Sequence, residues 1–462
     1  MLSVSGARGI VGKTMTPKVA MAFGRAFGSW LREHCREQPR VITGRDGRDS
    51  GAELLECAIA GLVQTGCHVT DLGVAMTPTI GVMVLHNKAN GALISTASHN
   101  PIEWNGFKCV DASGAAPRVE QANDIIQRFQ MELRNASPGE GSATTHLAGT
   151  PVTRQTDADE IHVRRVLNLI DVKAIRAATL RVVVDSVNGS GCNAVRMLLH
   201  ELGVELEHLN GVVTGQFAHT PEPTQANLHQ LADAVAKGGF SCGFAQDPDA
   251  DRLAIVDEFG RYIGEEYTLA LCALRVLERT GRGAMATNLS TSRMIDSVAK
   301  KFAGSHVYRS AVGEANVVAS MKKTSSVIGG EGNGGVIWPS VCWIRDSLSA
   351  IALTLELLAT RGKTLSVIVA EIPAVSMIKR KLELAGVGGI DAVKPALERV
   401  ANKYAHAKVD TTDGVRIDLP SGWVHLRASN TEPIIRLIAE AATANAANAL
   451  ADEVAAGAGL PL

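Results

Sequence analysis

The sequence predicts an α/β fold: three related α/β domains with mixed, mainly parallel sheets, plus a smaller C-terminal α+β domain. Three observations support this prediction. The chain has 462 residues, which is too many for one hydrophobic core. A weak internal repeat occurs three times in the first two thirds of the chain. Beyond residue 371 the pattern changes and the repeat is lost.

Each copy of the repeat reads as a strand, a polar turn, a helix that ends at a glycine, and a second strand. The three copies span residues 41–74, 180–209 and 284–308. A β-α-β unit implies parallel strands with helices packed on the faces of the sheet.

Changes in composition give the domain boundaries. Residues 135–149 are rich in Ser, Gly, Thr and Pro, and a second boundary lies near residues 258–266. In the last part of the chain, strand-like runs at 414–419 and 423–427 flank a turn and precede an alanine-rich helix. This is typical of a small antiparallel α+β domain. The predicted domains are residues 1–148, 149–257, 258–371 and 372–462.

The composition predicts a soluble, cytoplasmic protein. Lys and Arg number 46 against 47 Asp and Glu, so we expect no attraction to nucleic acid or anionic membranes. A locally basic pocket for an anionic substrate remains compatible with this balance. The eight cysteines form no CxxC pair, as in reduced proteins, and no leader or bilayer-spanning run is found.

The first loop that can carry chemistry is residues 96–101, directly after a strand-like run at 91–94. Ligands of α/β proteins gather at the carboxyl ends of strands, where this loop falls. Ser98 is a candidate nucleophile, with His99 and Lys108 as candidate proton shuttles. The alternative is a turn in which a polar side chain caps a helix.

The second loop contains Asp247, Asp249 and Asp251, after a strand-like run at 242–245. Three carboxylates at alternate positions of a tight turn can converge on one hard cation, Mg²⁺ or Ca²⁺. An EF-hand is rejected because its sixth position requires glycine and is Arg252 here, and because a strand-like run follows. The alternative is a solvated acidic turn.

The third loop, residues 330–335, matches the dinucleotide pattern GxGxxG, but the run Val336-Ile337-Trp338-Pro339 follows in place of the required helix. The dinucleotide interpretation is therefore rejected. Glycines around Glu331 and Asn333 would let a ligand approach closely and bond through its hydroxyls, unless the loop is merely a flexible turn.

The fourth loop, residues 427–433, combines Arg427 with Ser429, Asn430 and Thr431, and Arg436 lies just beyond. An arginine, two hydroxyls, an amide and free backbone N–H groups can form a phosphate cradle. The alternative is a structural turn.

Together the four loops resemble those of the α-D-phosphohexomutase superfamily, which includes phosphoglucomutase, phosphomannomutase and phosphoglucosamine mutase. The match begins at Gly6-Ala7-Arg8-Gly9 and runs through all four loops in the family order, so it covers essentially the whole chain.

The resemblance implies that Ser98 carries a phosphoryl group and that one Mg²⁺ ion is held by Asp247, Asp249 and Asp251 and contacts that group. It implies that a hexose phosphate receives the phosphoryl group, that the resulting hexose bisphosphate turns around, and that its other phosphoryl group returns to the serine. The sugar hydroxyls are then held by the third loop and the distant phosphate by the fourth, through Glu331, Asn333, Arg427, Ser429, Asn430, Thr431 and Arg436.

The resemblance also places basic residues around the serine. Arg252 would neutralise charge at Ser98, while Lys108, His99 and Arg8 match basic family positions, with Lys108 favoured as the proton shuttle. A base role requires a lowered pKa for Lys108.

Two departures bear on the sugar. Many members have serine in place of Asn333 and histidine in place of Gly335. The run Ser429-Asn430-Thr431 favours a phosphomannomutase/phosphoglucomutase, with phosphoglucosamine mutase as the alternative. Two rival functions are a metal-dependent sugar-phosphate phosphatase, which must admit water where a mutase excludes it, and a non-catalytic binder of sugar phosphates.

Overall fold

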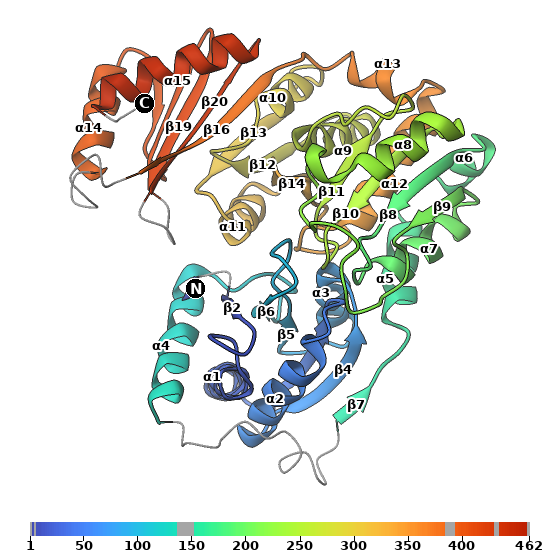
Figure 1. Ribbon diagram of the computed structural model, residues 1–462, viewed down its shortest axis with the longest axis vertical. Coiled ribbons are helices and arrows are strands. Elements are labelled where there is room, and N and C mark those ends of the chain that lie inside the picture. The colour runs from blue at the N-terminus through green and yellow to red at the C-terminus, as the bar shows by residue number, and fades with distance from the viewer. Residues whose placement is uncertain (1, 4–5, 136–151, 384–392, 429–433, 460–462) are drawn as a thin grey trace.

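The computed structural model describes residues 2–3, 6–135, 152–383, 393–428 and 434–459. Its strands form four sheets, and we call the unit built on each sheet domains I to IV in chain order. Figure 1 shows the four domains arranged as an arc in this order. The predicted first boundary, at residues 148/149, lies outside the described residues.

Domain I is a seven-stranded mixed sheet in the order β1-β2-β6-β5-β3-β4-β7. Its strands are β1 (Leu2–Ser3), β2 (Gly6–Ile10), β3 (Arg40–Arg45), β4 (His68–Val74), β5 (Gly91–Ser95), β6 (Trp104–Asp111) and β7 (Val152–Arg154). Its helices are α1 (Pro17–His34), α2 (Gly51–Gln64), α3 (Thr77–His86) and α4 (Val119–Asn135). α1 begins at Thr16, whose side chain accepts from the N–H of Val19, and has proline in its first turn.

Domain II is a four-stranded sheet in the order β11-β10-β8-β9. Its strands are β8 (Arg181–Asp185), β9 (Glu205–Leu209), β10 (Cys242–Gln246) and β11 (Leu253–Val256). Its helical segments are α5 (Ala158–Leu167), α6 (Val172–Ala177), α7 (Cys192–Glu201), the short 3-10 turn η2 (Gln225–Asn227) and α8 (His229–Gly238).

Domain III has the order β13-β12-β14-β15. Its strands are β12 (Ala284–Asn288), β13 (His306–Ser310), β14 (Ile328–Glu331) and β15 (Gly335–Ile337). Its helices are α9 (Glu265–Thr280), α10 (Met294–Ala299), α11 (Glu314–Thr324), α12 (Ser347–Arg361) and α13 (Leu365–Val369). α12 is well delimited, because the Asp346 side chain accepts from two N–H groups of its first turn and Gly362 ends it in a left-handed conformation.

The same sheet topology recurs in domains I, II and III, which confirms the predicted repeat. In each, the first strand of the repeat pairs in parallel with the second on one side and with a third on the other. A fourth strand then returns antiparallel to the third. The first three predicted loops are the connections between the third and fourth strands of the three domains.

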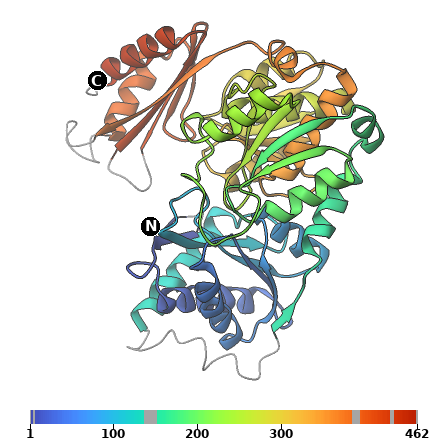
Figure 2. The same ribbon diagram turned by 45° about the vertical axis from the view of Figure 1, so that its right-hand side comes forward.

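Domain IV is a smaller, wholly antiparallel sheet in the order β16-β20-β19-β18-β17, as predicted. Its strands are β16 (Ser376–Glu383), β17 (Lys408–Asp410), β18 (Val415–Leu419), β19 (Gly422–Ala428) and β20 (Ile434–Ala441). Its helices, α14 (Val393–Lys403) and α15 (Ala444–Ala458), lie together beside the sheet (Figures 1 and 2).

The hydrophobic cores divide the molecule into a large body and a small one. One cluster of buried side chains continues through domains I, II and III, with Ile80, Phe244 and Ile351 as members. Domain IV has its own cluster, drawn from residues between Leu382 and Ala455. Domain IV is therefore attached to the rest without sharing a core. All eight cysteines are free thiols.

Candidate active site

Ser98 lies in the connection between β5 and β6, where its side chain is fully buried. Its backbone has a φ of 51°, a left-handed conformation that is uncommon for a residue other than glycine. The Thr96 hydroxyl holds this turn by accepting from the N–H of Ser98 at 2.8 Å. The Ser98 hydroxyl donates to Asp247 Oδ2 at 3.0 Å, so the serine of one domain meets the aspartate of the next.

Arg48, which sequence reasoning missed, holds the backbone of the serine loop. Its guanidinium is fully buried and pairs with Asp46 at 2.9 Å. It also donates to the carbonyl oxygens of Ser98, Asn100, Pro101 and Trp104. A buried cation that bonds four carbonyls of one loop fixes the backbone on which Ser98 stands.

Asp247, Asp249 and Asp251 are fully buried on the loop between β10 and β11, each with a carboxylate oxygen within 4.8 Å of the others'. Within the described part of the chain, Asp249 Oδ1 and Asp251 Oδ1 are buried and accept no hydrogen bond. Burial raises the pKa of Asp247 well above its usual value, and the charges of Asp251 and Asp249 add to the effect. Crowded, unsatisfied carboxylate oxygens fit a small hard cation such as Mg²⁺.

Lys108, on β6, reaches the same cluster. Its ammonium lies 2.7 Å from Asp249 Oδ2 and 3.1 Å from Asp251 Oδ2. Burial works against its charge, but the two carboxylates outweigh burial and raise the pKa of Lys108. This is the reverse of the lowered pKa that a base needs. The Thr77 hydroxyl, also missed from the sequence, donates to the same Asp249 oxygen at 2.7 Å.

The other predicted basic residues also lie around the serine. His99 Nδ1 is 3.4 Å from Ser98 Oγ, and burial, helped by Arg252 and Arg8, lowers the pKa of His99 to about 2. His99 is therefore a neutral imidazole at physiological pH. Arg8 donates to Asn100 Oδ1 at 2.8 Å, and Arg252 Nε lies 3.9 Å from Asp251 Oδ1.

Glu331, at the end of β14, is held between two donors. Asn288 Nδ2 donates to its Oε1 at 2.8 Å, and Arg345 donates to its Oε2 at 3.0 Å. Arg345, which sequence reasoning missed, also pairs with Asp251 at 2.7 Å, so the second and third loops are bonded through one side chain.

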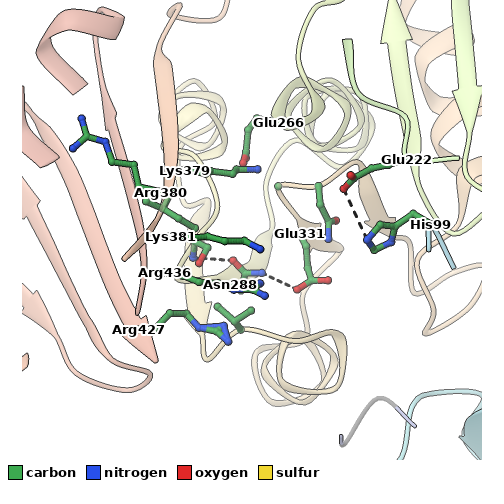
Figure 3. A pocket seen from close by; sticks show the side chains of 15 residues that line it. His99, Glu222, Glu266, Asn288, Glu331, Lys379, Arg380, Lys381, Arg427 and Arg436 are labelled. Carbon is green, nitrogen blue, oxygen red and sulfur yellow. Dashed lines mark hydrogen bonds and ion pairs between the residues drawn. The ribbon is translucent and has the colours of Figure 1, made fainter. Parts of the chain in front are cut away.

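A pocket of about 550 Å³ opens beside these loops and includes residues from all four domains. His99 of domain I and Glu222 of domain II line one side, and Glu331 of domain III lies between them and domain IV (Figure 3). Asn333 of domain III also lines the pocket. The domain IV side is basic, with Lys379, Arg380, Lys381, Arg427 and Arg436. A pocket of this size and charge suits a small phosphorylated molecule.

Three of these cations stand in a row across the sheet of domain IV. Arg427 on β19 is directly opposite Arg436 on β20, and Arg436 is directly opposite Lys381 on β16. All three cations line the pocket, where they would stabilise a bound anion. The rest of the predicted cradle, Ser429, Asn430 and Thr431, lies outside the described residues.

The residues that were missed carried weak signals. Lys381 ends the basic run Lys379-Arg380-Lys381, and Arg48 belongs to the polar turn after β3. Arg345 precedes the aspartate that caps α12. Arg48 contacts Ser98, and Arg345 contacts Asp251, across many positions of the sequence, so residue type alone could not reveal these contacts.

The fold and the site together define an enzyme of the phosphoryl-transfer class. Three repeated α/β domains bring a buried serine to a carboxylate cluster, and a fourth domain adds the basic side of the pocket. Models of the phosphoglucomutase/phosphomannomutase family match all four parts: α/β/α domain I at residues 2–135, domain II at 160–260, domain III at 265–375 and the C-terminal domain at 380–457. The chain belongs to this family, and the resemblance seen in the four loops is confirmed.

Individual proteins agree with this assignment. The chain is 38% identical to a phosphoglucomutase/phosphomannomutase of Thermococcus kodakarensis, over 94% of this chain and 93% of that protein. It is 30% identical to a phosphoglucosamine/phosphogalactosamine mutase of Sulfurisphaera tokodaii, with 98% of each chain covered. A crystal structure of a phosphoglucomutase/phosphomannomutase family protein from Burkholderia thailandensis aligns over 100% of both chains, with a TM-score of 0.84 and 27% identity. Among the described residues, no helix combines the length and apolar character needed to cross a membrane.

Proposed function

We propose that this protein interconverts hexose 1-phosphates and hexose 6-phosphates through a phosphoryl group carried on Ser98 and a hexose bisphosphate intermediate. The observation that carries the proposal is the contact between Ser98 Oγ and Asp247 at the metal-type cluster, beside a pocket with a basic wall. Phosphoryl transfer needs positioning and charge neutralisation more than covalent work by the protein, and this site is built for both.

Asp247, Asp249 and Asp251 would hold one Mg²⁺ ion, which supplies positive charge to the phosphoryl group on Ser98. A bound cation would offset the carboxylate charge that keeps Lys108 protonated, and this would favour the neutral amine that a base needs. Lys108 can then accept the proton of the attacking sugar hydroxyl, while Arg252 and Arg8 balance the charge of the phosphoryl oxygens.

The two half-reactions balance. A hydroxyl oxygen of the sugar forms a bond to the Ser98 phosphorus as the bond from phosphorus to Ser98 Oγ breaks. The hydroxyl proton passes to Lys108 and a proton returns to Ser98 Oγ, which gives a hexose bisphosphate and a free serine. After the bisphosphate turns around, Ser98 Oγ attacks the other phosphoryl group and regenerates the phosphoserine. A trace of hexose bisphosphate therefore activates any enzyme that has lost its phosphoryl group.

The pocket would bind the sugar between its two walls. Glu331 would accept hydrogen bonds from the sugar hydroxyls, and Asn333 could accept or donate them. The distant phosphate would bind to Arg427, Arg436 and Lys381, with Ser429, Asn430 and Thr431. We favour glucose and mannose phosphates as substrates, because of the fourth loop and the 38% identity to a phosphoglucomutase/phosphomannomutase. The alternative, glucosamine phosphate, is tested by comparing kcat/KM for the three 1-phosphates. We also propose a cytoplasmic location, in keeping with eight free cysteines.

The mechanism is tested by intact mass. The purified protein should contain a fraction heavier by one phosphoryl group, about 80 Da, and Ser98→Ala should lack both this fraction and turnover. Full turnover by Ser98→Ala, or by wild-type protein after exhaustive chelation of Mg²⁺, would contradict the proposal. Release of free phosphate in place of isomer would indicate a phosphatase.

A further inference from the structure

Arg345 joins three carboxylates that come from separate parts of the chain. It lies between β15 and α12, and only 8% of its surface is exposed. Its guanidinium donates from Nε to Glu314 Oε2 at 2.7 Å, from Nη1 to Glu331 Oε2 at 3.0 Å and from Nη2 to Asp251 Oδ2 at 2.7 Å. Each of the three nitrogens therefore serves a different carboxylate, an arrangement that the planar guanidinium allows and an ammonium does not.

The arginine determines which oxygens remain available. On Asp251, Oδ2 is used by Arg345 and Lys108, which leaves the buried Oδ1 for a cation. On Glu331, Arg345 takes Oε2 and Asn288 takes Oε1, so the carboxylate is fixed in the wall of the pocket. The same planar group thus sets the orientation of a candidate metal ligand and of a candidate sugar ligand.

The path of Arg345 also explains Gly335. A Cβ atom at position 335 would lie 2.2 Å from Arg345 Cδ and 2.9 Å from Arg345 Cγ. The aliphatic stem of the arginine therefore passes over the bare backbone of β15, where any side chain would displace it. The position of the Arg345 side chain therefore depends on glycine at position 335.

We propose that Arg345 is a positioning residue that couples sugar recognition at Glu331 to cation binding at Asp251. The proposal rests on the proposed function for the identity of the sugar, but the coupling itself is a property of the three side chains. A change at Glu331 reaches Asp251 because both carboxylates share one buried cation in a low-dielectric environment.

Magnesium binding, measured by calorimetry without any sugar, tests the coupling. Arg345→Met should weaken Mg²⁺ binding by about fivefold or more, because Asp251 loses its orientation. Arg345→Lys should recover only part of this loss, since the single nitrogen of lysine cannot take the three separate positions from which Arg345 donates. The control is Arg361→Met, which removes another networked arginine, paired with Glu278 and Glu371, and should leave Mg²⁺ binding unchanged.

Glu331→Gln separates coupling from a merely structural role. It should change Mg²⁺ affinity by about threefold when Arg345 is present and have no effect in the Arg345→Met background. Glu222→Gln, which alters a pocket carboxylate not bonded to Arg345, controls for charge acting through space. Equal effects of Glu331→Gln in both backgrounds would overturn the proposal.

Gly335→Ala provides an independent route to the same result. It should weaken Mg²⁺ binding as Arg345→Met does, and the double variant should be no worse than either single variant. Additive losses would contradict the proposal, and so would a normal Mg²⁺ affinity in Gly335→Ala. None of these measurements depends on turnover or on Ser98 phosphorylation. The coupling can therefore be disproved while the mutase function holds, and the mutase function can be disproved while the coupling holds.

Discussion

At the scale of single residues, the cation row Arg427–Arg436–Lys381 gives the sharpest test of phosphate binding. Lys381→Met should raise KM for a hexose 1-phosphate by about tenfold or more, the usual effect of losing a bond to a charged group, while kcat changes less. Steady-state kinetics measure both constants.

The control is Lys408→Met on the opposite edge of the same sheet, where the lysine faces Asp418. This variant should keep its KM. An unchanged KM in Lys381→Met would remove Lys381 from the phosphate site.

Residue type indicated Ser98 and the three aspartates, but not the arginines that hold them in place. Ser98 and the aspartates lie in short, continuous loops, so the sequence alone indicates their chemistry. Arg345 is separated from Asp251 by 94 positions, and Arg48 from Ser98 by 50. Such contacts depend on how the domains pack together. The sequence also could not show that the pKa of Lys108 is raised in the protein alone, because the carboxylates that raise it come from the next domain.

At the scale of elements, the joint between domains III and IV is polar. Arg293, at the start of α10, pairs with Asp418 at 2.8 Å, and the buried Arg416 of β18 stacks on Trp423, 4.0 Å from the ring centre. His425 of β19 is fully buried and lies 2.9 Å from the Ser290 hydroxyl through Nδ1. Its Nε2 lies 2.7 Å from the carbonyl of Asp413, so Nε2 carries the proton and Nδ1 accepts.

This joint predicts a pH dependence of stability. Burial lowers the pKa of His425 from 6.5 to about 4 despite the nearby Asp413 carbonyl. As the pH falls, His425 binds a proton at a higher pH in the unfolded chain than in the folded one. The stabilisation present above pH 6.5 is therefore lost as the pH falls toward 4. The loss is at most about 3 kcal/mol.

His425→Gln removes the titrating group but keeps a donor and an acceptor. Its free energy of unfolding, measured with urea at several pH values, should fall less steeply than that of the wild type between pH 6.5 and 4. Parallel curves for the two proteins would show that the pKa of His425 is the same in the folded and unfolded states.

The elements themselves were largely predictable. All three copies of the repeat appear as strand, helix and strand, because each follows a local pattern of apolar residues and glycine stops. The antiparallel return strands β6, β11 and β15 were harder to pair, since pairing depends on contacts across the sheet rather than on local pattern.

At the scale of the whole molecule, the separate cores predict motion of domain IV against a rigid body of domains I to III. A sugar phosphate that touches both parts should draw them together. Small-angle scattering should show a smaller radius of gyration when glucose 1-phosphate is added, and a weaker change for Arg427→Ala, which lacks one cation of the pocket. Identical radii with and without ligand in both proteins would exclude this closure.

The connection between the third and fourth strands has a further, evolutionary consequence. The three connections each contain a residue with positive φ, Ser98, Ala250 or Gly334, so the chain makes a sharp turn at the same point of the sheet topology in all three domains. Two duplications of one ancestral unit would supply all three turns already aimed at a common centre. Later substitutions would then separate the proposed roles: a nucleophile in the first connection, cation ligands in the second and hydroxyl ligands in the third.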